Sequence, residues 1–185
     1  TVGPASKPLG IETGAVVTGN IVGGTGNDTL NFSAFGSGRD FVLTGLGTHD
    51  GFKGTVNGIG GDFDDINALI GTTAYTDSLT GLNATAIWHI NTGTDQYEEI
   101  SSGRMLDHSL IESLIGGNGS DTFTFQNTAA FNGTLNGGTG IDTLNYSDYT
   151  TAVCVNLNTA NVTVSATNCL AGCYSRSGFG SNFGN

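Results

Sequence analysis

The chain has few basic residues, and this scarcity limits what it can bind. Lys and Arg together number five against 16 Asp and Glu, so the formal net charge is −11. A protein that binds nucleic acid gathers Lys and Arg on one face to neutralise phosphates. We therefore expect no nucleic-acid partner, and a cation such as calcium is the natural counter-ion for this sequence.

The sequence also lacks long apolar runs. No stretch approaches the roughly 18 consecutive apolar residues that a membrane-spanning helix needs, so we expect no membrane span. The scarcity of Lys, together with the many Thr residues and Asn-Gly pairs, is typical of an exported protein. These features predict an extracellular or cell-surface location.

Cysteine is rare, and its three copies lie late in the sequence, at Cys154, Cys169 and Cys173. In an exported chain an odd number predicts one disulfide with a free thiol, or a bond to another chain. A zinc site is disfavoured because the C-x3-C spacing has no second pair of ligands nearby. The sequence leaves the disulfide pairing open.

Proline occurs only twice, whereas glycine occurs 31 times. A glycine-rich chain can be disordered, but 37% of these residues are hydrophobic, which is enough to form a core. Short stretches such as Phe123–Phe125 and Leu144–Tyr146 alternate between apolar and polar residues. This alternation predicts β-strands with one buried face. The best candidate for a helix is Arg104–Leu114, where the apolar spacing is helix-like.

The most specific feature is a nonapeptide of the form G-G-x-G-x-D-x-U-x, in which U is a large apolar residue. It occurs at Gly23–Asn31, Gly116–Thr124 and Gly137–Asn145. Glycine permits the left-handed backbone of a tight turn and leaves carbonyl oxygens accessible to a hard cation. The Asp closes the turn with a carboxylate, and the apolar residue is expected to point inward from the following strand.

These glycine-aspartate turns are the candidate metal sites. Asp121 and Asp142 lie 21 residues apart, so their turns can stack and share a calcium ion. The candidate calcium ligands are Gly116, Asn118, Asp121, Gly137, Thr139, Asp142 and, in the first turn, Asp28. A degenerate turn adds three possible ligands, Asp62, Asp64 and Asp65. The alternative is that each Asp accepts backbone N–H bonds and holds no ion.

The sequence also repeats over a longer distance. Residues 30–35 match residues 144–149 at a constant offset of 114. We therefore divide the chain into an entry segment or linker at 1–20, a repeat region at 21–165 and a cysteine-containing tail at 166–185, flexible or docked on a neighbour. The repeat region would hold one module of about 114 residues and the start of a second. This predicts self-association into fibres or continuation into further repeats.

The nonapeptides resemble the calcium-binding β-roll repeats of RTX proteins. Longer stretches such as Asp77–Trp88 resemble the repeats of filamentous-haemagglutinin-like surface adhesins and exoproteins. The resemblance implies an all-β fold, a right-handed parallel β-solenoid of the β-roll or β-helix kind with Gly-Asp corner turns. It also implies calcium-assisted folding outside the cell and a structural or adhesive role, with a cell-surface or matrix polysaccharide as a possible target. RTX repeats run in unbroken tandem, whereas the turns here are separated by long spacers.

We expect no enzymatic activity. His49, His89 and His108 show none of the spacings that metal or nucleophilic sites use. Alternation places Trp88 and Ile90 on one strand face, as core residues rather than a sugar platform. Two alternatives to a fibre or adhesin remain: a monomeric RTX-type calcium-binding secretion module and a small carbohydrate-active β-helix enzyme.

Overall fold

A computed structural model describes residues 6–150 and, beyond them, only the backbone of four short strands. Every regular element in this part of the chain is a β-strand. Among the same residues, no helix is long and apolar enough to cross a membrane. The helix-like spacing of Arg104–Leu114 was misleading, because this stretch forms one strand and the start of another.

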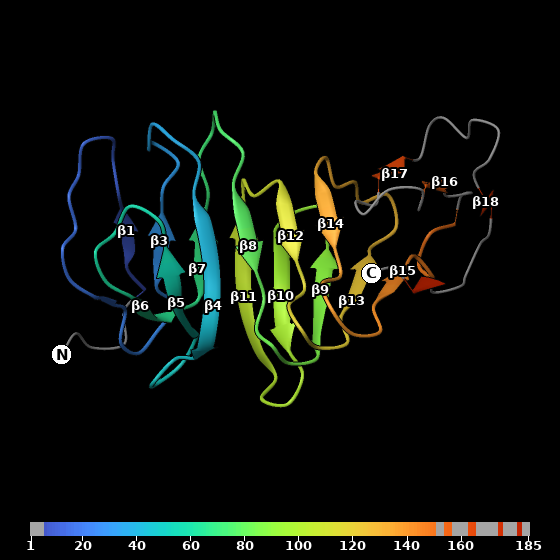
Figure 1. Ribbon diagram of the computed structural model, residues 1–185, viewed down its shortest axis with the longest axis horizontal. Helices are drawn as coiled ribbons and strands as arrows, with labels where there is room; N and C mark the ends of the chain where they lie inside the picture. The colour runs from blue at the N-terminus through green and yellow to red at the C-terminus, as the bar shows by residue number, and fades with distance from the viewer. Residues whose placement is uncertain (1–5, 151–153, 157–162, 166–173, 176–180, 183–185) are drawn as a thin grey trace.

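Two large sheets enclose the core (Figure 1). The nine-stranded sheet has the order β1 (Pro8–Gly10), β3 (Thr29–Asn31), β7 (Ala68–Ile70), β11 (Arg104–Ser109), β10 (Asp95–Glu99), β9 (Ala86–Ile90), β13 (Thr122–Phe125), β15 (Thr143–Asn145) and β19 (Ser181–Asn182). The seven-stranded sheet has the order β14 (Thr134–Asn136), β12 (Ser113–Ile115), β8 (Ser78–Thr80), β4 (Asp40–Leu46), β5 (Phe52–Val56), β6 (Phe63–Ile66) and β2 (Ile21–Val22). A small third sheet has the order β17 (Thr163–Ser165), β16 (Cys154–Asn156) and β18 (Tyr174–Ser175).

Both large sheets mix parallel and antiparallel neighbours, so the prediction of a right-handed parallel β-solenoid is wrong. Strands β4, β5 and β6 form an antiparallel meander in one sheet, and β9, β10 and β11 form another in the opposite sheet. The chain reverses within a sheet where glycines take a positive φ, at Gly51, Gly58 and Gly103. Outside the two meanders, the neighbours from β1 to β15 are parallel.

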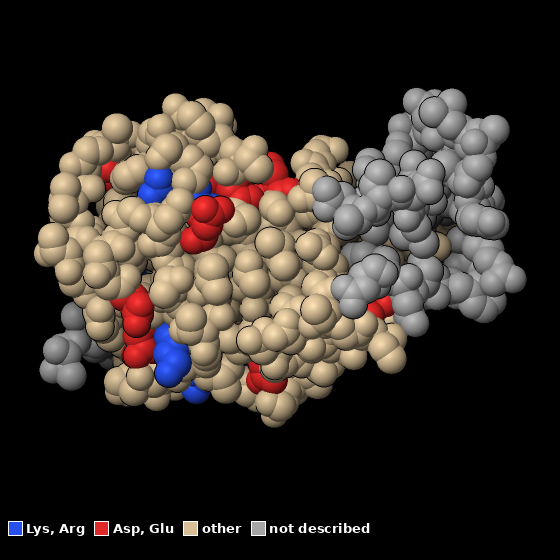
Figure 2. Space-filling view, viewed as in Figure 1, with Lys and Arg blue, Asp and Glu red and all other residues tan. Residues whose placement is uncertain are grey.

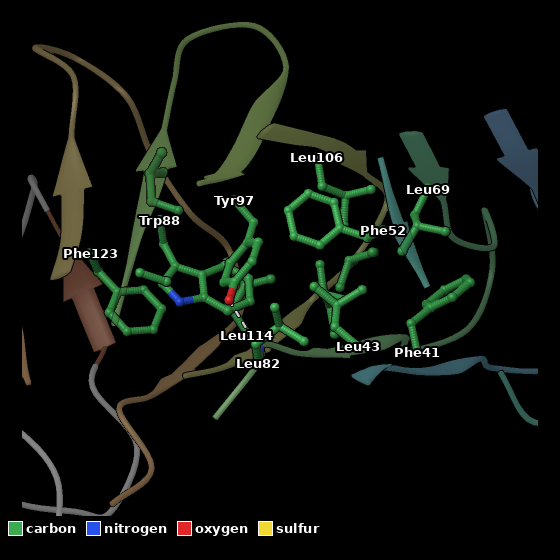
Figure 3. Close-up of a cluster of buried hydrophobic side chains, with 14 of the residues drawn as sticks. Phe41, Leu43, Phe52, Leu69, Leu82, Trp88, Tyr97, Leu106, Leu114 and Phe123 are labelled. Atoms are coloured by element: carbon green, nitrogen blue, oxygen red, sulfur yellow. Dashed lines mark hydrogen bonds between the residues drawn. The ribbon is translucent and has the colours of Figure 1, made fainter. Parts of the chain in front are cut away.

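The core lies between the two sheets and is rich in aromatic rings (Figure 3). Trp88 is fully buried, stacked on Phe123 with ring centroids 5.4 Å apart and packed edge-on against Tyr97 at 4.7 Å. Trp88 and Ile90 share the buried face of β9, as their alternation predicts. The Tyr97 hydroxyl accepts a hydrogen bond of 3.0 Å from the Leu82 amide, so its polar end is satisfied within the core.

The two ends of the region 6–150 have equivalent structures. We call residues 7–22 the upstream segment and residues 121–136 the downstream segment, which are related by the same offset of 114. In β1 and β3 Leu9 pairs with Leu30, and in β13 and β15 Phe123 pairs with Leu144. Both pairs are parallel.

Local turns in the two segments also correspond. The Ala15 amide donates to the Glu12 carbonyl at 3.0 Å, and the Ala129 amide donates to the Gln126 carbonyl at 2.9 Å. These turns contain Gly14 and Thr128, which both have positive φ, 87° and 68°. The segments share only two identical residues, Ala15 with Ala129 and Gly19 with Gly133, so sequence comparison alone did not detect that the repeat reaches back to residue 7.

Candidate functional site

The three glycine-aspartate turns occupy equivalent positions in the fold. Each follows a strand of the seven-stranded sheet (β2, β12 or β14) and leads into a strand of the nine-stranded sheet (β3, β13 or β15). The apolar residue after each Asp is fully buried, as predicted, at Leu30, Phe123 and Leu144. The Asp residues themselves, Asp28, Asp121 and Asp142, are buried as well.

The first glycine of each turn makes room for the carboxylate that closes it. A Cβ atom on Gly116 would lie 2.4 Å from Asp121 Oδ2, and one on Gly137 would lie 2.3 Å from Asp142 Oδ2. The second glycine serves the backbone, because Gly117 adopts a φ of 109°. Steric contact and conformation therefore explain the two consecutive glycines.

Two of these three carboxylates accept a hydrogen bond from the amide of the residue that precedes the neighbouring strand, in a series that we call the carboxylate ladder. Asp142 Oδ1 accepts from the Asp121 amide at 2.9 Å, and Asp28 Oδ1 accepts from the Lys7 amide at 3.2 Å. The seven-stranded sheet repeats the arrangement. There, Asp77 accepts from the Arg39 amide at 2.5 Å.

Two further members of the ladder were missed by the sequence analysis. The Asp77 amide donates to Glu112 Oε2 at 2.9 Å, and the Asp28 amide donates to Asn67 Oδ1 at 3.1 Å. Their shared signal is an Asp, Glu or Asn, then a small residue, then Leu or Phe, as in Glu112-Ser113-Leu114. This tripeptide marks the start of a strand even where the glycines are absent.

The aspartate turns also keep buried oxygens without a hydrogen-bond partner: Asp28 Oδ2, both oxygens of Asp121 and Asp142 Oδ2. Burial raises the pKa of Asp121 to about 7, the negative charge of Asp142 adds to the rise, and the Ala86 amide opposes it. Burial likewise raises the pKa of Asp142, against the effect of the Asp121 amide. The Ala86 amide faces Asp121 without meeting hydrogen-bond geometry, so a buried charge there is poorly compensated.

The donor chemistry at Asp121 and Asp142 suits a hard cation such as calcium, because all the available donors are oxygens. Within residues 6–150, however, no three His, Cys, Asp or Glu side chains gather closely enough to hold a metal ion. Carbonyl oxygens of the turns would have to complete a calcium site; the Gly137 carbonyl oxygen lies 2.3 Å from the place of a Gly116 Cβ. The predicted ligands Asn118 and Thr139 are exposed, and the Thr139 hydroxyl donates to Asn118 Oδ1 at 3.0 Å.

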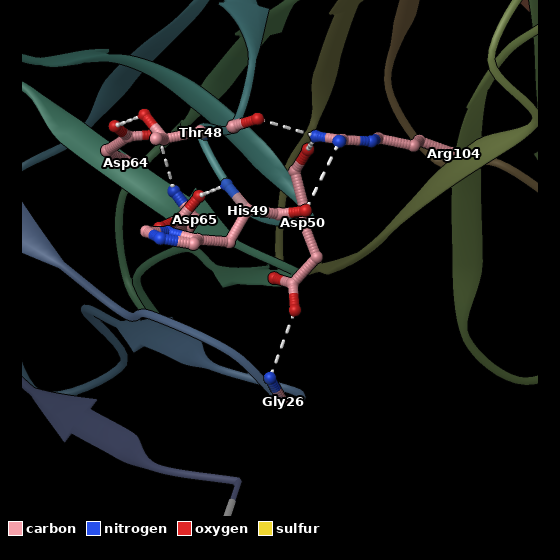
Figure 4. Close-up of polar contacts among 9 residues, drawn as sticks. Gly26, Thr48, His49, Asp50, Asp64, Asp65 and Arg104 are labelled. Atoms are coloured by element: carbon pink, nitrogen blue, oxygen red, sulfur yellow. Dashed lines mark hydrogen bonds and ion pairs between the residues drawn. The ribbon is translucent and has the colours of Figure 1, made fainter. Parts of the chain in front are cut away.

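The second group of predicted ligands holds a hairpin turn (Figure 4). Asp64 accepts from the Thr48 amide at 3.0 Å and from the Thr48 hydroxyl at 2.6 Å. Asp65 accepts from the His49 amide at 2.7 Å, and its other oxygen lies 2.7 Å from His49 Nδ1. Asp62 is exposed. Asp64 and Asp65 therefore tie β6 to the turn between β4 and β5.

Two further contacts anchor the same turn, which we call the 47–51 hairpin. The Arg104 guanidinium donates to the carbonyls of Gly47 at 2.8 Å and Gly51 at 3.1 Å. Asp50 Oδ2 accepts from the Gly26 amide at 3.0 Å, which links the hairpin to the first aspartate turn. The acidic residues here perform structural roles that spacing alone did not reveal.

The two other histidines differ in their surroundings. His89 pairs with Glu98 across β9 and β10 at 2.9 Å, whereas His108 is buried and burial lowers its pKa to about 3. Cys169 and Cys173 lie outside the described residues, as does the Cys154 side chain, so the disulfide stays a prediction. On the face shown in Figure 2, Lys and Arg side chains form no continuous patch.

The chain matched no family model, no curated protein and no solved structure.

Proposed function

We propose that this chain is part of an extracellular structural or adhesive protein, a fibre or large surface adhesin. Modules of 114 residues would stack end to end, with calcium at the aspartate turns. The observation that carries the proposal is the equivalence of the upstream and downstream segments. A fold whose two ends repeat one another can be extended by adding further modules.

The edges of the seven-stranded sheet support such extension. By the offset of 114, Leu135 in β14 corresponds to Ile21 in β2. Ile21 pairs with Phe63 of β6, whereas β14 ends its sheet and, among the residues that the structure describes, pairs with β12 alone. In β2 the equivalent edge is paired with β6. A β6-like strand of a following module could pair in the same way with the edge of β14 that has no partner strand among the described residues.

The use of the acidic side chains supports a structural rather than an enzymatic role. Asp64, Asp65, Asp77 and Glu112 all accept hydrogen bonds from backbone amides. Glu99 does the same with the amides of the turn that follows it. These carboxylates fix turns and strand starts, and catalytic acids or bases would instead present free oxygens to a substrate.

Calcium enters the proposal through the unpartnered oxygens of Asp121 and Asp142. A divalent cation between them would offset the mutual repulsion of two buried carboxylates. We expect calcium to raise the unfolding temperature of the chain and EGTA to reverse the rise. The double variant Asp121→Asn, Asp142→Asn should lose this response, whereas the exposed control Asp148→Asn should keep it.

Stacking is tested with a chain in which one module is duplicated, residues 1–136 followed by residues 23–185. Its junction joins Asn136 to Gly23, which stands in the place of Gly137. Stacked modules should unfold in one cooperative transition, and small-angle scattering should show a particle that is longer and equally thick. Two separate transitions, each with the midpoint of the single chain, would contradict the proposal.

A further inference from the structure

The upstream and downstream segments correspond in their strand pairing and in one hydrogen-bonded turn, and their first three residues differ in ways that bear on strand pairing. Lys7, Pro8 and Leu9 stand where the downstream segment has Asp121, Thr122 and Phe123. In the downstream segment these three residues lie at the start of β13 and face β9, the strand next to β13 on the side nearer to β1. In the upstream segment the corresponding side of β1 is the outer edge of the nine-stranded sheet (Figure 1).

Two of the three downstream residues, Thr122 and Phe123, attach β13 to β9. Phe123 stacks on Trp88 of β9. The Gln126 amide donates to the Ile90 carbonyl at 2.9 Å. Because alternate residues of a parallel strand donate to opposite sides, the Thr122 amide points toward β9 as well.

The corresponding upstream residues cannot make these contacts with a neighbouring strand. The amides of Lys7 and Ile11 donate toward the β3 side, to Asp28 and to the Asn31 carbonyl. Because successive amides alternate in direction, an amide at position 8 would point to the opposite side, the outer edge of the sheet. Pro8 has no amide hydrogen to donate there. Lys7 places an ammonium group where the downstream segment has a carboxylate, and a lysine at the edge of a sheet disfavours the addition of another strand.

The third change alters the apolar contact. Phe123 is fully buried against Trp88, whereas Leu9 is 42% exposed on the outer strand. Proline and lysine are two of the devices by which natural sheets prevent further strands from adding to an edge. Here Lys7 directly precedes the edge strand β1 and Pro8 is its first residue, whereas the equivalent internal strand has neither a lysine nor a proline at these positions.

We propose that the upstream segment is a terminating cap, which prevents a β9-like strand of a preceding module from pairing with β1. The stack would then grow only in the direction of β15 and β14. Chain can continue upstream of the cap, but it cannot join the nine-stranded sheet as a parallel strand at β1. This inference rests on the proposed stacking of modules.

Two duplicated chains of equal length provide the test, because they differ only in the segment at the junction. The first is the chain of residues 1–136 followed by 23–185, which has residues 121–136 at the junction. The second has residues 1–120 followed by 7–185, so that Lys7 and Pro8 meet β9 of the first copy. A third chain adds Lys7→Asp and Pro8→Thr in the second copy of the second chain.

We expect the first and third chains to unfold in one transition and the second to unfold in two. Limited proteolysis should cut the junction of the second chain at least about tenfold faster than that of the others. If the second chain unfolds in one transition with the midpoint of the first, the cap is refuted while stacking stands. If the third chain behaves like the second, Lys7 and Pro8 do not cause the block and the inference fails. If the first chain also unfolds in two transitions, stacking itself fails, and the cap fails with it.

Discussion

The imidazole Nδ1 of His49 lies 2.7 Å from Oδ2 of Asp65, so a largely exposed ring is held by a fully buried carboxylate. The His49 amide donates to the other oxygen of the same carboxylate. Asp65 has a φ of 59°, a conformation that L-residues rarely adopt. These hydrogen bonds connect β6 to the 47–51 hairpin, and they make this connection sensitive to pH.

The hydrogen bond that the His49 ring donates to Asp65, together with the negative charge of Asp65, raises the pKa of His49 above its ordinary value of 6.5. A raised histidine pKa adds stability that is complete below about pH 6.5 and is lost as pH rises through the folded-state pKa. The His49→Gln variant should lose this part of the pH dependence when urea unfolding is measured from about pH 5.5 to 8.5. A proton NMR titration in which His49 titrates at or below 6.5 would contradict the assignment.

Asp121 should show a pH dependence of the same sign in a lower pH window. Its pKa is raised to about 7 by burial and by Asp142, so the folded state binds more protons than the unfolded state between about pH 4 and 7. In EGTA, stability should fall as pH rises through this window, and Asp121→Asn should stabilise the protein above pH 7 by on the order of 2–4 kcal/mol. In calcium the wild type should gain stability and the variant should not. Equal pH profiles for the two proteins in EGTA would disprove the prediction.

The first glycine of an aspartate turn should tolerate no side chain. Gly137→Ala places a methyl group 2.3 Å from Asp142 Oδ2, and relieving this clash must move the buried carboxylate or the turn. We expect a loss of about 2–3 kcal/mol in the free energy of unfolding, measured by denaturant titration. Gly93→Ala is the matched control, because nothing lies within 4 Å of its Cβ position. Equal effects of the two substitutions would show that the close approach is unimportant.

Trp88 should be the centre of the aromatic core. As the single tryptophan of the chain it reports on its own burial, so native fluorescence should be blue-shifted and poorly quenched by acrylamide. Trp88→Ala should cost roughly 3–5 kcal/mol of stability, measured by circular dichroism, because it empties a site between Phe123 and Tyr97. Tyr75→Ala, at a residue that is 47% exposed, should change stability by less than about 1 kcal/mol. A native emission spectrum typical of solvent-exposed tryptophan would contradict the packing.

Removing the guanidinium of Arg104 should loosen the 47–51 hairpin. Arg104→Lys keeps the charge but cannot reach the Gly47 and Gly51 carbonyls with the same planar group. We expect faster amide hydrogen exchange across the hairpin with little change in the exchange of β13. Unchanged exchange in the hairpin would mean that Asp64, Asp65 and the Asp50–Gly26 hydrogen bond hold it without Arg104.

Strand formation and the aspartate turns could be predicted because they depend on local residues. Alternation placed Trp88 inside, and the nonapeptides placed Leu30, Phe123 and Leu144 inside. The spacing of Asp121 and Asp142 matched their contact in adjacent strands. The direction of the neighbouring strands was predicted wrongly at β5 and β10, because an alternating strand has the same pattern in a parallel or an antiparallel pair.

By itself, the sequence determined that this chain forms short strands joined by glycine-aspartate turns and repeats after 114 residues. The tertiary structure alone decided where the chain reverses within a sheet and which carboxylates meet which amides. Asp65 and His49, or Asp77 and Arg39, come together only when distant segments pack, and no local pattern encodes that proximity. Backbone preferences act over a few residues, whereas the partners of a buried carboxylate are fixed by the arrangement of the whole sheet.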